Sequence, residues 1–245
     1  MKPTGPVRAL RNAPLHAFVV LLSLTLSCQA PAAVPSIPRA GPGKAAIASA
    51  YPLASDAGKE ILAKGGNAFD AAVAVAAALA VVEPSSSGLG GGGFFLIRRA
   101  SDGREIMIDL REMAPGAAHR DMYLDKEGNV VPGLSRDSAL AAGIPGEPAG
   151  LAHLAKKYGR LPLSVSLAPA IRLARDGFPL YTRLRGGMEF NKNAFLKTPD
   201  AARVFLVDGA VPPLGHVIRQ PDLAASLEVL AKQGGEGFYQ GEVAR

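Results

Sequence analysis

A stretch of almost entirely apolar residues runs from Ala68 to Val82, and its only charged residue is Asp70. Asn67, directly before it, is a favourable N-cap residue, and Asp70 can accept hydrogen bonds from free N–H groups of the first turn. A helix that is apolar on all sides is usually buried, so this stretch predicts a central buried helix that Pro84 terminates. At about fifteen residues it is too short and too rich in alanine for a membrane span.

A serine- and glycine-rich segment, Ser85–Gly93, follows this helix and leads into the apolar residues Phe94–Ile97. Gly88, Gly90 and Gly93 match the spacing G-x-G-x-x-G, but a dinucleotide-binding fingerprint needs a strand before the glycines and a helix after them. That order is reversed here, and no Gly-Lys-Ser/Thr follows, so a P-loop is excluded.

The glycines of this segment have two remaining interpretations. They could expose backbone N–H groups to a ligand, or they could allow a positive φ or a close approach where a strand passes under a packed helix. The packing interpretation is favoured, because glycine-rich loops are mostly structural.

Alternating residues predict a second strand at Glu105–Leu110, joined to the first by a hairpin turn at Ser101–Gly103. One face of this strand carries Ile106, Ile108 and Leu110, and the other carries Met107, Asp109 and Arg111. Arg111 therefore lies at a strand end beside the glycine segment, where a planar guanidinium could bind a carboxylate through two hydrogen bonds. Local evidence favours a structural ion pair of Arg111 with Asp109 or Glu112 instead.

The rest of the chain shows mainly helical patterns. We expect a short strand at Ala46–Ala50, a loop-rich stretch at Pro115–Gly143, and helices at Ala54–Ala63, Glu147–Tyr158, Ser164–Asp176, Thr182–Phe195 and Pro221–Lys232. Gly65, Gly159, Gly177 and Gly234 are suited to end four of these helices.

The first 33 residues have the pattern of an export signal. Basic residues precede an apolar core at Leu15–Leu26, and small residues around Ala30–Ala32 provide a cleavage site. Cys28 raises a lipoprotein as the less favoured alternative, because Thr25 stands where a lipobox usually has leucine. Residues 34–45 then form a tether rich in proline and glycine, and residues 46–245 form the folded part. We therefore expect an exported protein, periplasmic or extracellular.

Removing the signal changes the charge and the available chemistry. The formal charge of +6 falls to +3, because Lys2, Arg8 and Arg11 leave and no acidic residue leaves with them. That charge is too small for a nucleic-acid-binding surface. Cys28 is the only cysteine, so its removal excludes a disulfide scaffold, a cysteine metal site and a cysteine nucleophile.

Other candidate chemistry is limited. Three scattered histidines, His119, His153 and His216, have no metal-ligand spacing. Ser85–Ser87 would need a positioned base to act as nucleophiles, and the sequence assigns none. Glu83 and Glu112 could be paired carboxylates for acid–base catalysis, but a structural role is favoured, and we interpret Glu147 as an architectural residue at a turn. These residues alone predict no catalytic group, no metal and no cofactor.

Six segments between Ile47 and Arg245 carry a combined pattern: ASAYPLASDAGKEILAKGGNAFDAAVAVAAALAVVEP, SSSGLGGGGF, DLREMAP, GIPGEPAGL, YGRLPLSVSLAPAIRLARDGFPL and QPDLAASLEVLAKQGGEGFYQGEVA. In this order they resemble the front part of the large subunit of the gamma-glutamyltransferases, also called gamma-glutamyltranspeptidases, which are N-terminal-nucleophile hydrolases. The resemblance implies an α+β fold of the αββα sandwich type, incomplete in this chain. It also implies that Arg111, in DLREMAP, binds the alpha-carboxylate of a gamma-glutamyl donor.

The resemblance implies transfer of a gamma-glutamyl group from glutathione or a related donor to amino acids, peptides or water. In this family the nucleophile is a threonine that autocleavage exposes at the start of a small subunit. None of Thr4, Thr25, Thr182 and Thr198 lies in such a motif. We therefore expect the nucleophile beyond the chain end, the small subunit as a partner, and no activity from this chain alone. A related acylase, acting on cephalosporin, glutaryl or poly-gamma-glutamate substrates, and a non-catalytic exported binding module are the alternatives.

Overall fold

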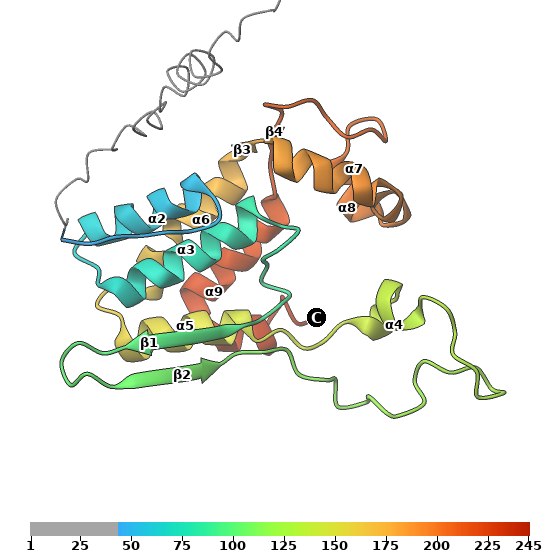
Figure 1. Ribbon diagram of the computed structural model, residues 1–245, viewed down its shortest axis with the longest axis horizontal. Helices are drawn as coiled ribbons and strands as arrows, with labels where there is room; N and C mark the ends of the chain where they lie inside the picture. The colour runs from blue at the N-terminus through green and yellow to red at the C-terminus, as the bar shows by residue number, and fades with distance from the viewer. Residues whose placement is uncertain (1–43) are drawn as a thin grey trace, which may run out of the picture. The chain divides into compact units, whose positions relative to one another are not determined.

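The computed structural model describes residues 44–245. The predicted export signal and all but the last two residues of the predicted tether lie outside the described residues. Within the unit Ile47–Arg245, the predicted central helix is α3 (Ala68–Val82), with the predicted bounds (Figure 1).

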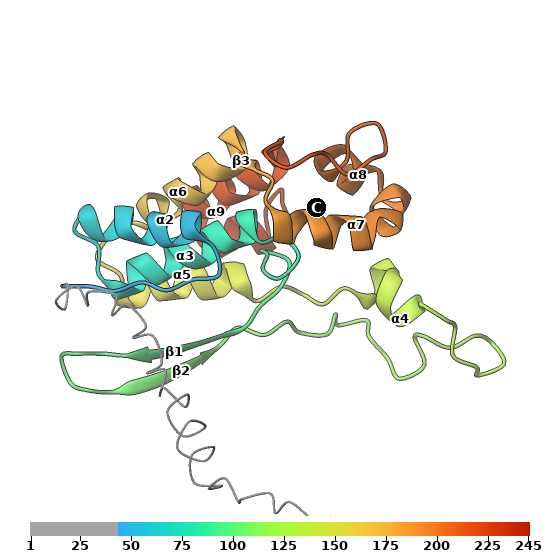
Figure 2. The same cartoon turned by 45° about the horizontal axis from the view of Figure 1, so that its top comes forward.

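Helices surround α3 on several sides. It packs against α2 (Pro52–Ala63), α5 (Glu147–Tyr158) and α6 (Leu163–Asp176), and α9 (Pro221–Tyr239) packs against α5 and α6 (Figures 1 and 2). The side chains of α3 that face this core are alanines and valines with no exposed surface, among them Ala74, Ala77 and Val81. Such small side chains allow neighbouring helices to approach closely, which explains the alanine-rich sequence.

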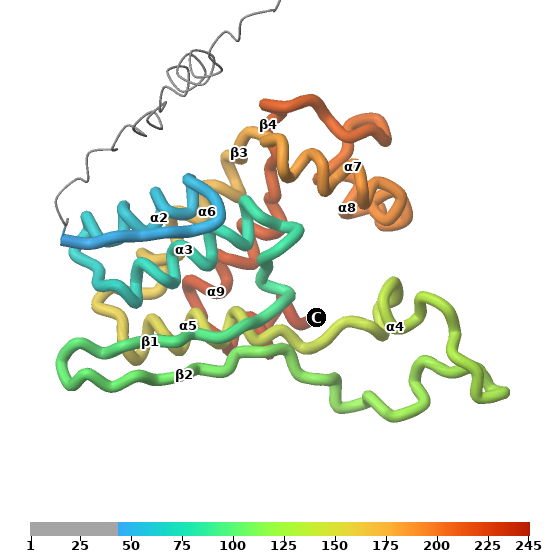
Figure 3. The backbone as a smooth tube through the Cα atoms, viewed as in Figure 1, coloured from blue at the N-terminus to red at the C-terminus, as the bar shows by residue number. Residues whose placement is uncertain are grey.

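The predicted hairpin is formed by β1 (Phe94–Arg98) and β2 (Glu105–Asp109), which pair antiparallel with Leu96 opposite Met107. As predicted, Ile106 and Ile108 face the helical core, whereas Met107 and Asp109 are exposed. The remaining strands, β3 (Phe178–Pro179) and β4 (Val217–Ile218), pair with each other at the start of α7 (Thr182–Lys197). Figure 3 traces the long connection from β2 to α5, which carries only α4 (Leu134–Asp137) and a short 3-10 turn at Ala139–Ala141.

Some expectations are wrong. Residues 46–50 form no strand, because the side chain of Ile47 packs on Gly58 of α2 instead of lying beside a sheet edge. α9 continues past the predicted end at Lys232 to Tyr239, but as a second helical segment, because Gly234, with a φ of 62°, ends the first segment as predicted. α8 (Pro199–Phe205) is a helix that the sequence pattern did not indicate.

Gly65, Gly159 and Gly177 end their helices, as predicted, and of these three Gly159 alone has a negative φ. Position 159 requires glycine because it has no room for a side chain: a Cβ there would lie 2.4 Å from Oδ1 of Asp70. The backbone therefore passes directly over a buried carboxylate.

Asp70 joins the start of α3 to the connection between α5 and α6. Asn67 and Asp70 form the predicted capping box, with the Asn67 N–H donating to Oδ2 of Asp70 at 2.8 Å. The same carboxylate, which has no exposed surface, also accepts from the N–H groups of Arg160 at 2.9 Å and Leu161 at 3.3 Å. Three backbone donors thus converge on one carboxylate, and two of them come from about ninety residues away along the chain.

We predict that Asp70→Ala lowers the free energy of unfolding by about 2 to 4 kcal/mol, because it leaves three backbone N–H groups buried without their charged acceptor. Thermal and urea unfolding of the protein would measure this loss. Asp56→Ala is the matched control, since Asp56 is an exposed aspartate of α2 that pairs only with Lys59, and its stability should be nearly unchanged. Equal stability of the two variants would contradict the structural role of Asp70.

Candidate substrate-binding site

The backbone of Leu110 lies between two glycines from different parts of the chain. Gly93 extends the hairpin ladder, since Gly93 and Leu110 exchange hydrogen bonds of 3.2 and 3.1 Å. A Cβ on Gly92 would lie 2.1 Å from the Leu110 carbonyl oxygen, and a Cβ on Gly146 would lie 2.0 Å from the same atom. Neither position tolerates a side chain, so both glycines are there for close backbone packing.

At Gly92, this finding supports the packing interpretation of the glycine segment. None of the glycines between Gly88 and Gly93 has a positive φ, so close approach rather than an unusual backbone conformation is the reason for Gly92. Gly90, in contrast, has open space where a Cβ would be. The segment therefore combines a packed end with an open part that lines a cavity.

The start of α5 is tied to the same segment. The carbonyl oxygen of Gly91 accepts hydrogen bonds from the N–H groups of Gly146 and Glu147, both at 3.0 Å. Further along, Met113 and Ile144 exchange two backbone hydrogen bonds of 3.0 and 2.8 Å. As a result, the chain between Leu110 and Met113 is fixed against both the glycine segment and α5.

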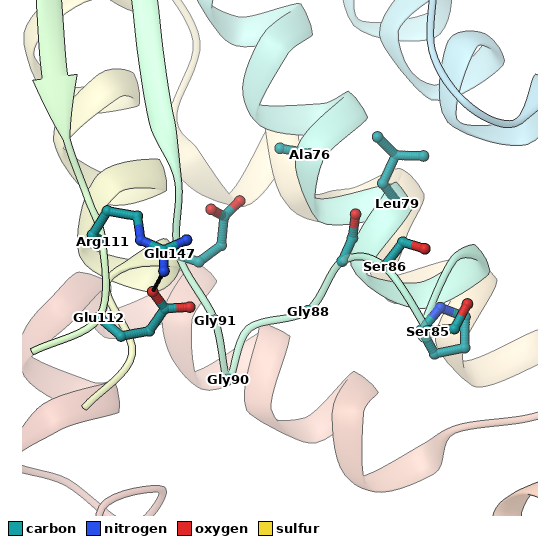
Figure 4. Close-up of a pocket in the computed structure, with 13 residues that line it drawn as sticks. Ala76, Leu79, Ser85, Ser86, Gly88, Gly90, Gly91, Arg111, Glu112 and Glu147 are labelled. Atoms are coloured by element: carbon teal, nitrogen blue, oxygen red, sulfur yellow. Dashed lines mark ion pairs between the residues drawn. The ribbon is translucent and has the colours of Figure 1, made fainter. Parts of the chain in front are cut away.

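These segments enclose a cavity of about 600 Å³. Its lining consists of Ala76, Leu79, Pro84, Ser85, Ser86, Ser87, Gly88, Gly90, Gly91, Gly92, Arg111, Glu112 and Glu147. Figure 4 shows the charged residues Arg111, Glu112 and Glu147 together on one side, with Ser85 and Ser86 across the glycine segment from them. The cavity thus has a charged wall, formed by Arg111, Glu112 and Glu147, and a serine wall, formed by Ser85, Ser86 and Ser87.

Of the two ion pairs that the sequence analysis considered for Arg111, the described residues show the one with Glu112, whereas Asp109 contacts only the Arg111 backbone. The backbone N–H of Arg111 donates to Oδ1 of Asp109 at 2.9 Å, and its Nη2 lies 3.2 Å from Oε2 of Glu112. The Arg111 side chain nevertheless remains 58% exposed, and its guanidinium has five N–H donors, of which this ion pair uses few. Oε2 of Glu112 is buried and makes no aligned hydrogen bond. Arg111 therefore can bind a carboxylate within the cavity while it stays paired with Glu112.

Glu147 is the first residue of α5, which agrees with the predicted helix bounds but not with the interpretation of Glu147 as a turn residue. Its backbone N–H has the expected architectural role at Gly91, but its half-buried carboxylate also lines the cavity (Figure 4). Burial raises the pKa of this carboxyl group above its ordinary value. The sequence pattern could not show this exposure to the cavity, because it depends on where α5 lies relative to β2.

Glu83 and Glu112 have different partners and do not form the acid–base pair considered above. Glu83 is only 2% exposed and accepts a hydrogen bond from the hydroxyl of Tyr181. Burial and this bond to Glu83 raise the pKa of Tyr181. Within residues 44–245, no hydrogen bond connects the hydroxyls of Ser85, Ser86 or Ser87 to a side-chain base.

The three histidines lie apart from this cavity's lining: His119 in the long loop, His153 in α5 and His216 before β4. In the described part of the chain, no cluster of three or more His, Cys, Asp or Glu side chains is placed to hold a metal ion.

The sequence profile named "Gamma-glutamyltranspeptidase" matches residues 54–245. The chain belongs to the gamma-glutamyltranspeptidase family. An Escherichia coli protein named "Glutathione hydrolase proenzyme" is 39% identical over 94% of this chain. The chain covers only 42% of that relative.

Solved structures agree with this assignment. A Helicobacter pylori gamma-glutamyltranspeptidase is 42% identical with a TM-score of 0.80, over 84% of this chain and 59% of that one. A Pseudomonas nitroreducens gamma-glutamyltranspeptidase, complexed with L-DON, is 38% identical with a TM-score of 0.75, over 83% and 59%. The predicted α+β fold of an N-terminal-nucleophile hydrolase is thereby confirmed. Residues 44–245 themselves contain only two-stranded sheets, and the incompleteness of the sandwich remains a prediction.

We predict that Gly92→Ala lowers the free energy of unfolding by about 1 to 3 kcal/mol, because the added methyl group would overlap the Leu110 carbonyl. Gly90→Ala in the same segment is the control, since its methyl group would enter open space. Thermal unfolding of both variants measures the difference. If Gly90→Ala proves as harmful as Gly92→Ala, close packing at Leu110 is not what requires glycine.

A second prediction concerns pH. Because the carboxyl group of Glu147 has a raised pKa, the folded protein retains its proton to higher pH than the unfolded chain does. The cost of burying the charge is therefore absent near pH 4 and develops as the pH rises through the raised pKa. Glu147→Gln removes this cost. The melting temperature of the variant minus that of the wild type should therefore become more positive as the pH rises from 4 to 7. A melting-temperature difference that stays constant or decreases over this pH range would contradict a raised pKa of Glu147.

Proposed function

We propose that the complete protein transfers the gamma-glutamyl group of glutathione or a related donor to water, an amino acid or a peptide. Membership of the family and the relative named glutathione hydrolase proenzyme support this proposal. The observation that carries it is Arg111, which lines the cavity and directly follows Leu110, whose backbone is packed between Gly92 and Gly146. The cavity is large enough for a small peptide.

Arg111 is the proposed ligand of the donor's alpha-carboxylate. A guanidinium can bind a carboxylate through two parallel charge-assisted hydrogen bonds, which fix its orientation as well as its position. The ion pair with Glu112 would keep the guanidinium in place before a donor binds. Such preorganisation reduces the conformational entropy that binding costs.

The proposed nucleophile is a threonine encoded beyond Arg245, at the start of a small subunit from the same precursor. Its hydroxyl would add to the gamma-carbonyl carbon, its own alpha-amino group would accept the hydroxyl proton, and the amine of the donor would leave with a proton. The resulting ester would then be attacked by water or by an acceptor amine. The word proenzyme in the name of the relative and the partial coverage of that relative support this arrangement.

The outer face of the hairpin is the proposed contact surface for the small subunit. Three of its side chains are apolar and strongly exposed: Phe94 at 59%, Leu96 at 73% and Met107 at 61%. Leu96 and Met107 are direct cross-strand neighbours, so the apolar surface is continuous. In an αββα sandwich, a second sheet would cover this face.

The proposed precursor also includes an export signal at residues 1–33 and a tether at residues 34–45, ahead of the folded part at 46–245. The basic and apolar pattern of the first 33 residues supports export. Among residues 44–245, no helix combines the length and the apolarity that crossing a membrane requires.

For the complete enzyme, we predict that Arg111→Ala raises the KM for glutathione about 30-fold, which corresponds to about 2 kcal/mol of lost binding, because the donor carboxylate loses its charged partner. Arg111→Lys should recover only part of this loss, since an ammonium cannot form two parallel hydrogen bonds. Steady-state kinetics over a range of glutathione concentrations measure both variants.

Arg120→Ala provides the control, because the Arg120 side chain is 94% exposed in the long loop and, within residues 44–245, pairs only with its neighbour Asp121. Unchanged KM and kcat in the Arg111→Ala enzyme would refute the role of Arg111.

A parallel assay with glutaryl compounds, which keep a terminal carboxylate but lack the amino group, separates a gamma-glutamyl enzyme from a glutaryl acylase. Faster turnover of the glutaryl compounds would favour the acylase.

A further inference from the structure

The serine wall of the cavity begins at the C-terminal end of α3. Glu83 is the C-cap residue of this helix, and its carbonyl oxygen accepts hydrogen bonds from the N–H groups of Ser86 and Ser87, both at 2.9 Å. Pro84 and the three serines that follow line the cavity, but Glu83 does not. The position of the serine wall therefore depends on how firmly Glu83 is held.

Side chains from distant parts of the chain hold this helix end. The hydroxyl of Tyr181 contacts the Glu83 carboxylate and also lies 3.0 Å from the carbonyl oxygen of Val82. Nε2 of Gln220 donates to the carbonyl oxygen of Val81 at 2.8 Å. The last carbonyl groups of a helix have no partner within the helix, so these contacts satisfy groups that would otherwise be buried unpaired.

Tyr181 is itself well fixed. It is the N-cap residue of α7, and its ring stacks on that of Tyr51, the N-cap residue of α2, with 4.2 Å between ring centroids. In Figures 1 and 2, the start of α7 lies beside the end of α3, although Tyr181 and Glu83 are 98 residues apart in sequence. Tyr181 is not among the residues that line the cavity, so any influence on the site acts through Glu83.

Removing the hydroxyl of Tyr181 would leave the Glu83 side chain buried without its partner. Among residues 44–245, the Tyr181 hydroxyl is the one side-chain donor to this carboxylate. A buried acceptor that loses such a donor costs free energy, and the least costly response is a local shift that brings it to water. Since Glu83 is followed at once by Pro84 and Ser85, such a shift would move the serine wall.

We propose that Tyr181 is a positioning residue, whose hydroxyl holds Glu83 and through it the serine wall opposite Arg111. The consequence for catalysis rests on the proposed function. The consequence for the mobility of the serine wall does not, so the two are tested separately.

The test compares variants of the complete protein. Tyr181→Phe keeps the ring and its stacking on Tyr51 but removes the hydroxyl, whereas Glu83→Gln keeps an oxygen acceptor of the same shape. Ile61→Val is the control for stability alone, because Ile61 is fully buried in α2 and is absent from the cavity lining. Each variant is measured by amide hydrogen exchange at Ser86 and Ser87, by its melting temperature, and by KM and kcat for glutathione.

In the Tyr181→Phe protein, we expect exchange at Ser86 and Ser87 to become about tenfold faster and the KM for glutathione to rise about fivefold, with a smaller change in kcat. Glu83→Gln should stay close to wild type in both. Ile61→Val should lower the melting temperature without changing exchange at the two serines or the KM.

Two results would overturn the proposal. One is that Tyr181→Phe lowers the melting temperature as Ile61→Val does but leaves exchange and KM unchanged. The other is that Glu83→Gln loosens the serines as much as Tyr181→Phe does. Faster exchange in Tyr181→Phe, combined with no gamma-glutamyl activity in the wild-type protein, would instead support the positioning role and contradict the proposed function.

Discussion

The close backbone packing around Leu110 is the contact on which the site depends. Gly92 and Gly146 each approach the Leu110 carbonyl at a distance that leaves no room for a Cβ, and the carbonyl of Gly91 accepts two hydrogen bonds from the start of α5. Three segments that are separate in sequence are thereby joined through their main chains. Backbone contacts of this kind allow less adjustment than side-chain packing, so the backbone of Arg111, the next residue, has a well-defined place at the cavity wall.

The opposite wall is anchored by different means. At the start of α3, the Asp70 carboxylate accepts hydrogen bonds from backbone N–H groups in the connection between α5 and α6. At its end, Tyr181 and Gln220 donate hydrogen bonds to α3 carbonyl groups. Between these ends its alanine and valine side chains are buried among three other helices. The serine wall continues directly from this helix. Rigid placement of both walls would suit the proposed binding of a small charged donor in one orientation.

Local sequence signals were sufficient for elements whose ends are set by neighbouring residues. The bounds of α3 and α5 were predicted correctly, because a capping box and a glycine lie next to them, and the two faces of β2 followed from simple alternation. The second role of Asp70, the Tyr181 contact and the cavity-facing side of Glu147 could not be predicted, because each depends on a segment far away in sequence. The residues alone favoured a structural role for Arg111, and its proposed binding role came from the family resemblance.

A crystal structure of the complete protein with L-glutamate, the common part of all gamma-glutamyl donors, would examine the site most directly. We predict that the alpha-carboxylate lies against the guanidinium of Arg111, with two N–H···O distances of about 2.7 to 2.9 Å. We also predict that the side-chain carboxylate of the ligand points away from Arg111, toward the part of the protein that provides the nucleophile. A ligand bound elsewhere, or bound in this cavity with its alpha-carboxylate away from Arg111, would contradict the account.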